Sequence, residues 1–170
     1  MSLARLVAAT ALGCAGCATT SGTSVPQSLA VPGGSARKVS LHAEGVQIYQ
    51  CKQKGDDRDA FEWALKAPDA ELTDASGAKA GKHYGGPTWE AADGSKVMGE
   101  VKEKAPSPDG IPWLLLKAKA NEGSGAFSDV TFVQRLDTRG GQAPADGCDA
   151  THGGEEKRVP YTATYLFFTH

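Results

Sequence analysis

Alternation of apolar and polar residues is the feature that most constrains this fold. Successive side chains of a β-strand point to opposite faces, so a period of two predicts strands with one buried face. No apolar stripe with a helical period reaches helical length, and we therefore expect an all-β chain. Runs with period two are Lys38–Ala43, Val46–Cys51, Phe61–Lys66, Thr88–Glu90, Val97–Val101, Trp113–Ala120, Phe127–Leu136 and Tyr161–Phe168.

Turn-forming residues separate these runs. Asp93-Gly94 is the strongest hairpin signal, because glycine supplies the positive φ that tight turns need. Further turn signals lie at Gly55–Asp57, Ala75–Gly77, Pro106–Gly110 and Asn121–Gly125. About eight short strands at this spacing predict a single antiparallel β-sandwich or barrel over residues 36–170.

The first residues resemble an export signal. Arg5 supplies a positive charge, the apolar run Leu6–Gly13 follows, and small residues end the segment. This order is typical of a secretory signal peptide, and the run is shorter than the ~20 apolar residues that span a bilayer. We expect a signal peptide at residues 1–18 and a flexible tether, rich in Ser, Thr, Pro and Gly, at residues 19–35.

Two ways of processing this leader remain open. Cleavage after Ala18 would release a soluble secreted protein. Alternatively, Cys17 or Cys14 would become the lipid-bearing first residue of a bacterial lipoprotein. We favour Cys17, because Ala15-Gly16 precedes it and a polar Thr/Ser stretch follows. The expected location is periplasmic or lipid-anchored at the outer membrane, and otherwise secreted.

Two cysteines remain in the body of the chain, Cys51 and Cys148. Two thiols in an oxidising compartment most simply pair, so we predict one disulfide that closes a long loop. The Gly-, Ala- and Asp-rich segment Thr138–Arg158 contains Cys148 and interrupts the strand pattern. We interpret it as a loop pinned by this disulfide, with a binding loop as the alternative.

The charge distribution excludes one class of partner. The chain has 18 basic and 20 acidic residues and a formal net charge of −2, and no stripe of Lys and Arg occurs. Nucleic-acid binding needs such clustering, so we expect no nucleic-acid partner. Membrane contact is expected only through the N-terminal lipid anchor.

Six segments of the chain together resemble a known family. They are Gly45–Cys51, Gly81–Glu90, Ile111–Lys117, Asp129–Thr138, Pro144–Cys148 and Val159–Ala163. The family consists of uncharacterised secreted bacterial and fungal proteins, a domain of unknown function, and the resemblance covers roughly Val25 to Phe168. It implies no activity, and although some fungal relatives are labelled malate dehydrogenase, the dinucleotide fingerprint is absent here. The nearest string, Gly123–Ser128, lacks the third glycine and leads into a predicted strand.

The segment Gly81–Glu90 is the richest in reactive and aromatic side chains. His83 can exchange protons and Glu90 can orient it, so these two are the candidate catalytic residues. Tyr84 and Trp89, with Trp113, are candidate ligand-binding residues, because aromatic faces stack on sugars and apolar rings. The alternative interpretation is that the aromatic residues cap the core and His83 bonds a carbonyl group.

No metal or cofactor is expected. His42 and Glu44 share a strand face, but a third ligand would have to come from His83, His152 or His170, and no spacing requires it. G-x-S-x-G, S-x-x-K and H-E-x-x-H motifs are absent. Asp129 and Arg135 share a face six residues apart, too far to pair, so each needs a partner on a neighbouring strand.

Three hypotheses follow. The first is a non-catalytic binding or structural module of the cell envelope, with a small ligand as its partner in the binding case. The second is an enzyme, such as a small-molecule hydrolase, that uses His83 and Glu90. The third is an envelope protein whose partner is another protein. The absence of catalytic motifs favours the first.

Overall fold

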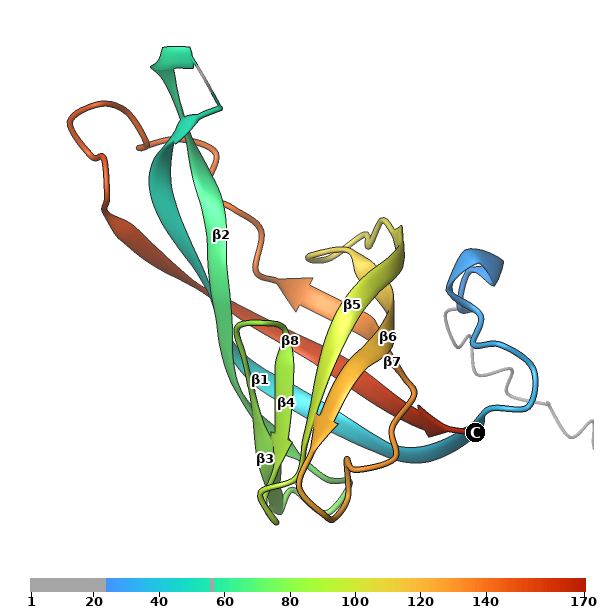
Figure 1. Ribbon diagram of the computed structural model, residues 1–170. Coiled ribbons are helices and arrows are strands. Elements are labelled where there is room, and N and C mark those ends of the chain that lie inside the picture. Colours follow the sequence, from blue (N-terminus) through green and yellow to red (C-terminus); the bar gives the residue numbers. More distant parts are fainter. Residues whose placement is uncertain (1–23, 56) are drawn as a thin grey trace, which may run out of the picture.

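The computed structural model describes residues 24–55 and 57–170 and confirms the all-β expectation. One sheet of eight antiparallel strands closes on itself, so the architecture is a barrel and not a sandwich (Figure 1). Each strand pairs with its neighbours in sequence, and β1 pairs with β8. The elements are η1 (Gln27–Leu29), β1 (Ala36–Lys54), β2 (Asp57–Thr73), β3 (Lys79–Tyr84), β4 (Thr88–Ala91), β5 (Lys96–Ala105), β6 (Trp113–Glu122), β7 (Phe132–Gly140) and β8 (Glu156–Thr169).

Several strands are longer than the short strands expected. β1 has 19 residues and joins two predicted runs across Glu44-Gly45. Gly45 does not turn the chain there, because β2 passes so close that a Cβ on Gly45 would lie 2.2 Å from the carbonyl oxygen of Asp69. Glycine at this position therefore permits a close approach of two strands within a continuous β1.

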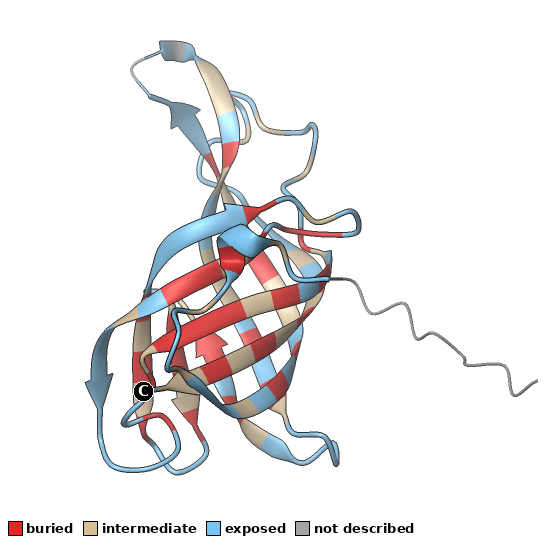
Figure 2. Cartoon of the chain, turned by 90° about the vertical axis from the view of Figure 1, so that its right-hand side faces the viewer, coloured by how far each residue is buried: buried red, intermediate tan, exposed pale blue. Residues whose placement is uncertain are grey.

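The barrel wall separates an inner core from an outer surface. Buried and exposed residues alternate along its strands, as Figure 2 shows. Leu41, Leu72, Leu116 and Val133 from four different strands are each less than 4 % exposed and belong to one inner cluster. The period-two pattern of the sequence therefore records the two faces of this wall.

Both ends of the barrel receive a side chain from a loop. At the lower end in Figure 1, Phe127 enters the core from the loop between β6 and β7. At the upper end, Ile111 enters from the loop between β5 and β6, and its amide donates to the carbonyl oxygen of Gly140 at 3.0 Å. Residues 127–131, expected to begin a strand, are therefore loop. A strand with period two over Phe127–Leu136 would put Val130 and Phe132 on one face, and that expectation is wrong. Val130 belongs to the inner cluster and Phe132 to the outer one.

The N-terminal segment covers part of the outer wall. Leu29 is fully buried beside Trp113, Leu115 and Phe132. Its carbonyl oxygen accepts a hydrogen bond of 2.6 Å from Nε2 of Gln134. Leu29 and the partly buried Val31 thus pack against the barrel within the segment 19–35 that was expected to be a tether, of which residues 19–23 lie outside the described part of the chain. The predicted signal peptide and the lipidation candidates Cys14 and Cys17 lie outside the described residues.

A long hairpin of β1 and β2 projects beyond the barrel as an arm (Figure 1). The loop 141–155 lies against it, and the predicted disulfide between Cys51 and Cys148 joins the two, with a sequence separation of 97. Trp63 packs beside this disulfide in a small separate cluster. Among the described residues, no helix has the length and apolar character needed to cross a membrane.

Candidate functional site

The hairpin of β3 and β4 carries most of the predicted site residues and divides them between two faces. His83 lies opposite Trp89 in the strand register, and Lys82 lies opposite Glu90. Because side chains alternate along a strand, His83 and Trp89 point into the barrel while Lys82 and Glu90 point outward. Burial agrees, since His83 is 2 % and Trp89 is 1 % exposed.

The outward face holds a small polar network. The Tyr84 hydroxyl donates to a Glu90 carboxylate oxygen at 2.8 Å, and Nζ of Lys82 lies 3.3 Å from the other oxygen. These partners, the tyrosine first, lower the pKa of Glu90. A surface cavity of about 460 Å³ at the lower ends of β3 and β4 includes Lys82 and Glu90 in its lining. Glu90 is therefore an ionised surface carboxylate with no access to His83.

The inward face packs His83 among aromatic rings. The imidazole stacks on the indole of Trp89, and the ring of Tyr165 meets it edge-on at 5.1 Å between centroids. Nδ1 lies 2.8 Å from the carbonyl oxygen of Thr88, so the neutral ring donates from Nδ1. Burial lowers the pKa of His83 to about 3, and the charge of Arg135 adds to this effect. His83 is thus uncharged at neutral pH, and the structure does not bring it together with Glu90.

The three candidate ligand-binding aromatic residues also lie apart. Tyr84 is on the outer face of the barrel, and Trp89 is inside it. Trp113 begins β6 and is buried on the outer wall beneath Leu29. Tyr84 ends β3 and Trp89 lies on β4, where it pairs with His83, so the register of this hairpin puts Tyr84 and Trp89 on opposite faces. The burial of Trp113 depends on the docking of the N-terminal segment.

The barrel interior contains a group of polar side chains that no sequence motif marks as a site. Gln47, Tyr161 and Tyr165 are 1 %, 3 % and 0 % exposed. Nε2 of Gln47 and the hydroxyls of both tyrosines are buried without a hydrogen-bond partner. Buried polar groups are rarely left in this state, so this cluster marks a place where a partner is missing.

Arg135 lies beside this cluster, on β7. It is directly opposite Tyr165 of β8, and it shares the inward face with Val133, two residues before it. Nε and Nη2 both donate to the carbonyl oxygen of Pro112, at 3.1 and 2.8 Å. Among the described residues, no carboxylate lies within 4.0 Å of the guanidinium. The only sequence signal for this residue was an arginine in an apolar strand that needs a partner on a neighbouring strand.

Two large apolar residues on the inward side are exposed near the upper end of the barrel. Leu65 lies opposite Tyr49 and is 55 % exposed; Val101 lies opposite the buried Leu116 and is 46 % exposed. Residues on this side of the wall are buried lower down, where Trp89, Phe127 and Phe167 fill the core. At the upper end, by contrast, Leu65 and Val101 reach solvent on the inward side of the wall, although Ile111 packs into the core nearby.

Comparison with known proteins places the chain in a family. Residues 32–169 match the family described as "Protein of unknown function (DUF3455)". The chain belongs to this family. The match includes all eight strands, Arg135 and both cysteines of the disulfide. No curated protein and no solved structure matches the chain.

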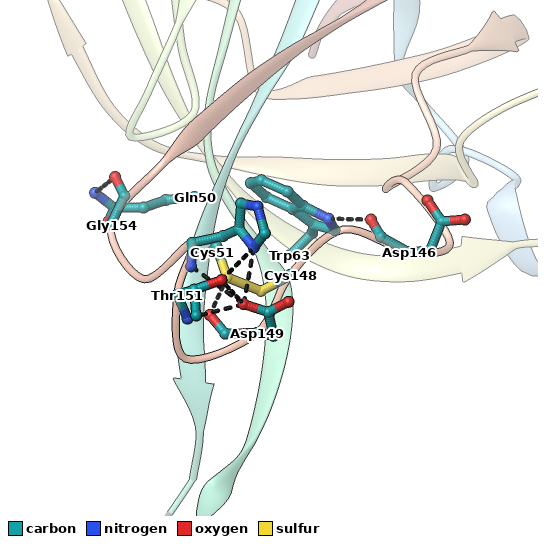
Figure 3. The surroundings of a disulfide bond; sticks show 9 residues. Gln50, Cys51, Trp63, Asp146, Cys148, Asp149, Thr151 and Gly154 are labelled. Carbon is teal, nitrogen blue, oxygen red and sulfur yellow. Dashed lines mark hydrogen bonds and ion pairs between the residues drawn. A yellow bond between two sulfur atoms is a disulfide. The ribbon is translucent and has the colours of Figure 1, made fainter.

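The disulfide region of this DUF3455 protein forms a second concave surface. The indole Nε1 of Trp63 donates to the carbonyl oxygen of Asp146 at 2.8 Å, which ties β2 to the loop that carries Cys148 (Figure 3). Asp149 accepts hydrogen bonds from the Thr151 hydroxyl and from the backbone amide of Thr151. A cavity of about 320 Å³ lies between the arm and the loop, with Phe61, Trp63 and Pro144 in its lining.

The histidines considered for a metal site are dispersed. His42 and Glu44 are exposed on the outer side of β1, whereas His83 is inside the barrel. His152 lies 2.8 Å from a carboxylate oxygen of Asp149 in the loop near the disulfide, and His170 meets the ring of Phe132 edge-on. Within residues 24–55 and 57–170, no three potential metal ligands gather.

Proposed function

We propose that this protein is an exported, non-catalytic binding module of the cell envelope that holds a small ligand inside the upper end of its barrel. The observation that carries the proposal is the buried polar cluster of Gln47, Tyr161 and Tyr165, in which the amide Nε2 and both hydroxyls lack hydrogen-bond partners. A ligand that supplies these partners would account for side chains that are otherwise costly to bury.

The two halves of the interior differ in how their space is filled. An eight-stranded barrel is just wide enough to be filled by its own side chains or to hold one small ligand. In the lower half, stacked and edge-on aromatic rings fill the space, including Phe127 on Phe167 at 4.4 Å. In the upper half, each buried polar group without a partner costs about 1–3 kcal/mol. Among the residues that the structure describes, the lower half contains one such atom, Nε1 of Trp89, and the upper half contains three. Together with the exposure of Leu65 and Val101, this contrast favours the upper half as the binding region.

Arrangement of the candidate catalytic residues supports a binding role over an enzymatic one. His83 and Glu90 point to opposite sides of the wall, and the pKa of His83, lowered to about 3, makes it a poor proton acceptor at neutral pH. Export is supported by the leader pattern and by the disulfide, which persists in oxidising compartments. Lipid attachment at Cys17 or Cys14, and an envelope protein as partner, remain predictions.

Mass spectrometry of the protein purified from its native envelope tests this function. We expect an additional mass under native conditions that disappears on denaturation. Tyr165→Phe, which removes one hydroxyl of the cluster, should lower the ligand-bearing fraction, whereas Tyr84→Phe on the outer face should leave it unchanged. A bare native mass, together with no binding of any small molecule in a ligand-detected NMR screen, would contradict the proposal.

A further inference from the structure

The partner of Arg135 defines what kind of ligand the upper end of the barrel suits. A guanidinium has five N–H donors, and here one carbonyl oxygen, that of Pro112, receives two of them. Arg158, by comparison, makes an ion pair of 2.6 Å with Asp69 on the surface. Arg135 is partly buried and has no such carboxylate among the described residues. A partly buried guanidinium is stabilised by a nearby negative charge, and the described residues supply none to Arg135.

The neighbours of Arg135 offer further donors. Arg135 lies directly opposite Tyr165 in the strand register, and Tyr161 lies four residues before Tyr165 on the same inward face of β8. Burial raises the pKa of Tyr161 and of Tyr165, and the positive charge of Arg135 opposes the shift in both. Neither hydroxyl makes a hydrogen bond of good geometry with the other or with Arg135. Tyrosine hydroxyls so buried stay protonated and can donate.

Gln47 adds a further donor from β1, the strand that pairs with β8 on the side away from β7. A Cβ built on Gly141 would lie 2.8 Å from Cβ of Tyr161 and 3.2 Å from Cγ of Gln47, so both side chains flank the same backbone. Nε2 of Gln47 is a donor without a partner. Guanidinium, hydroxyl and amide groups that all have protons to donate match the acceptor oxygens of an anion.

We infer that the upper interior of the barrel is an oxyanion site, in which Arg135, Tyr161, Tyr165 and Gln47 bind the carboxylate or phosphate group of a small organic ligand. Its apolar part lies toward the exposed inward-facing side chains of Leu65 and Val101. This inference deepens the proposed binding function and rests on it. The imidazole of His83, which meets Tyr165 edge-on, is uncharged at neutral pH, so Arg135 supplies the positive charge of the site.

Titration of the full mature protein with two probes tests the assignment. The probes are inorganic phosphate and butyrate, added at constant ionic strength and followed by ¹H–¹⁵N NMR, including the Nε–H signal of Arg135. We expect saturable shifts confined to β7, β8 and the Gly141 region. Butyrate should bind more tightly if the natural ligand is a carboxylate with an apolar part, and phosphate if it is a phosphate. Saturable binding of either probe at Arg135 supports the site.

Matched variants separate this site from general charge effects. Arg135→Gln should weaken binding by at least about tenfold, the value of one charged hydrogen bond. Arg139→Gln removes the same charge from an exposed position on the same strand and should leave binding unchanged. Tyr161→Phe and Tyr165→Phe keep the packing and remove one donor each, so they report on the site even if Arg135→Gln fails to fold.

The outcomes distinguish the two proposals. If the native protein carries a neutral ligand, or if a probe binds equally well to wild type and Tyr165→Phe, the oxyanion assignment is overturned while a binding function stands. If no ligand co-purifies and neither probe gives saturable shifts, both proposals fail.

Discussion

His83 and Trp89 stack inside the barrel, with ring centroids 4.5 Å apart and ring planes 9° from parallel. They face each other across the β3–β4 hairpin, and the ring of Tyr165 closes the group edge-on to both. Aromatic contacts of this kind contribute about 0.5–1.5 kcal/mol beyond the burial of area. His83, the candidate catalytic residue, is therefore part of the core, where its uncharged imidazole packs against Trp89 and Tyr165.

The burial of His83 predicts a pH dependence of stability. Its pKa is about 3 in the folded protein and near 6.5 in the unfolded chain. The contribution of neutral His83 to the free energy of unfolding is therefore fully present above pH ~6.5. It is lost as the pH falls toward 3, because the histidine takes up a proton in the unfolded chain before it does so in the folded protein. The slope is at most about 1.4 kcal/mol per pH unit.

Urea unfolding between pH 7 and 5 measures this loss, in a range where carboxylates remain ionised. His83→Gln should flatten the dependence on pH, whereas His42→Gln, at an exposed position, should keep the wild-type slope. Equal slopes in wild type and His83→Gln would show that His83 is not a buried neutral residue.

The disulfide predicts a large loss of stability on reduction. Cys51 and Cys148 close a loop that contains most of the domain, with a separation of 97 residues. Replacing both by Ala should lower the free energy of unfolding by about 2–5 kcal/mol, the usual effect of removing a native disulfide. The double variant should match the wild type treated with a reductant, and the reductant should not change the variant further. Identical unfolding curves for oxidised and reduced wild type would refute the bridge.

Local alternation predicted most strands but could not choose between barrel and sandwich. Closure depends on β1 pairing with β8 from Ala36 opposite Thr169 to Gln50 opposite Glu156, a contact between the two ends of the domain. Residues so far apart in sequence leave no local signal of their pairing. Gly45 illustrates the same limit, since its glycine resembled a break between strands and instead admits β2.

The candidate site shows a similar division. Sequence chemistry singled out His83 and Glu90 as neighbours in the chain, but strand alternation puts them on opposite faces. Arg135 was noticed only as an arginine that needs a partner on another strand, because its inner neighbours Tyr161 and Tyr165 belong to the last strand. The unpartnered hydroxyls that define the cluster depend on packing across the barrel, which no short motif encodes.

Docking of the N-terminal segment predicts that one leucine stabilises the domain. Leu29 is fully buried against Trp113 and Phe132, so Leu29→Ala should cost about 2–5 kcal/mol through lost burial and the cavity it leaves. Val25→Ala, at a position 42 % exposed in the same segment, should change stability by less than about 0.5 kcal/mol. Thermal unfolding of the two variants measures the difference. A melting temperature for Leu29→Ala equal to that of wild type would mean that the segment is not held against the barrel.

Closure of the lower end predicts that Phe127 is essential to the core, although it lies in a loop. Its ring stacks on Phe167, and its amide is held by the hydroxyl of Ser95 at 3.0 Å. Phe127→Ala should lower the free energy of unfolding by about 3–5 kcal/mol, because the cavity opens onto the aromatic stack. Phe61→Ala, at a partly buried position on the projecting arm, should cost less, since the arm can adjust. Chemical denaturation of both variants measures the two losses of unfolding free energy. Equal costs for the two would show that the loop between β6 and β7 does not seal the barrel core.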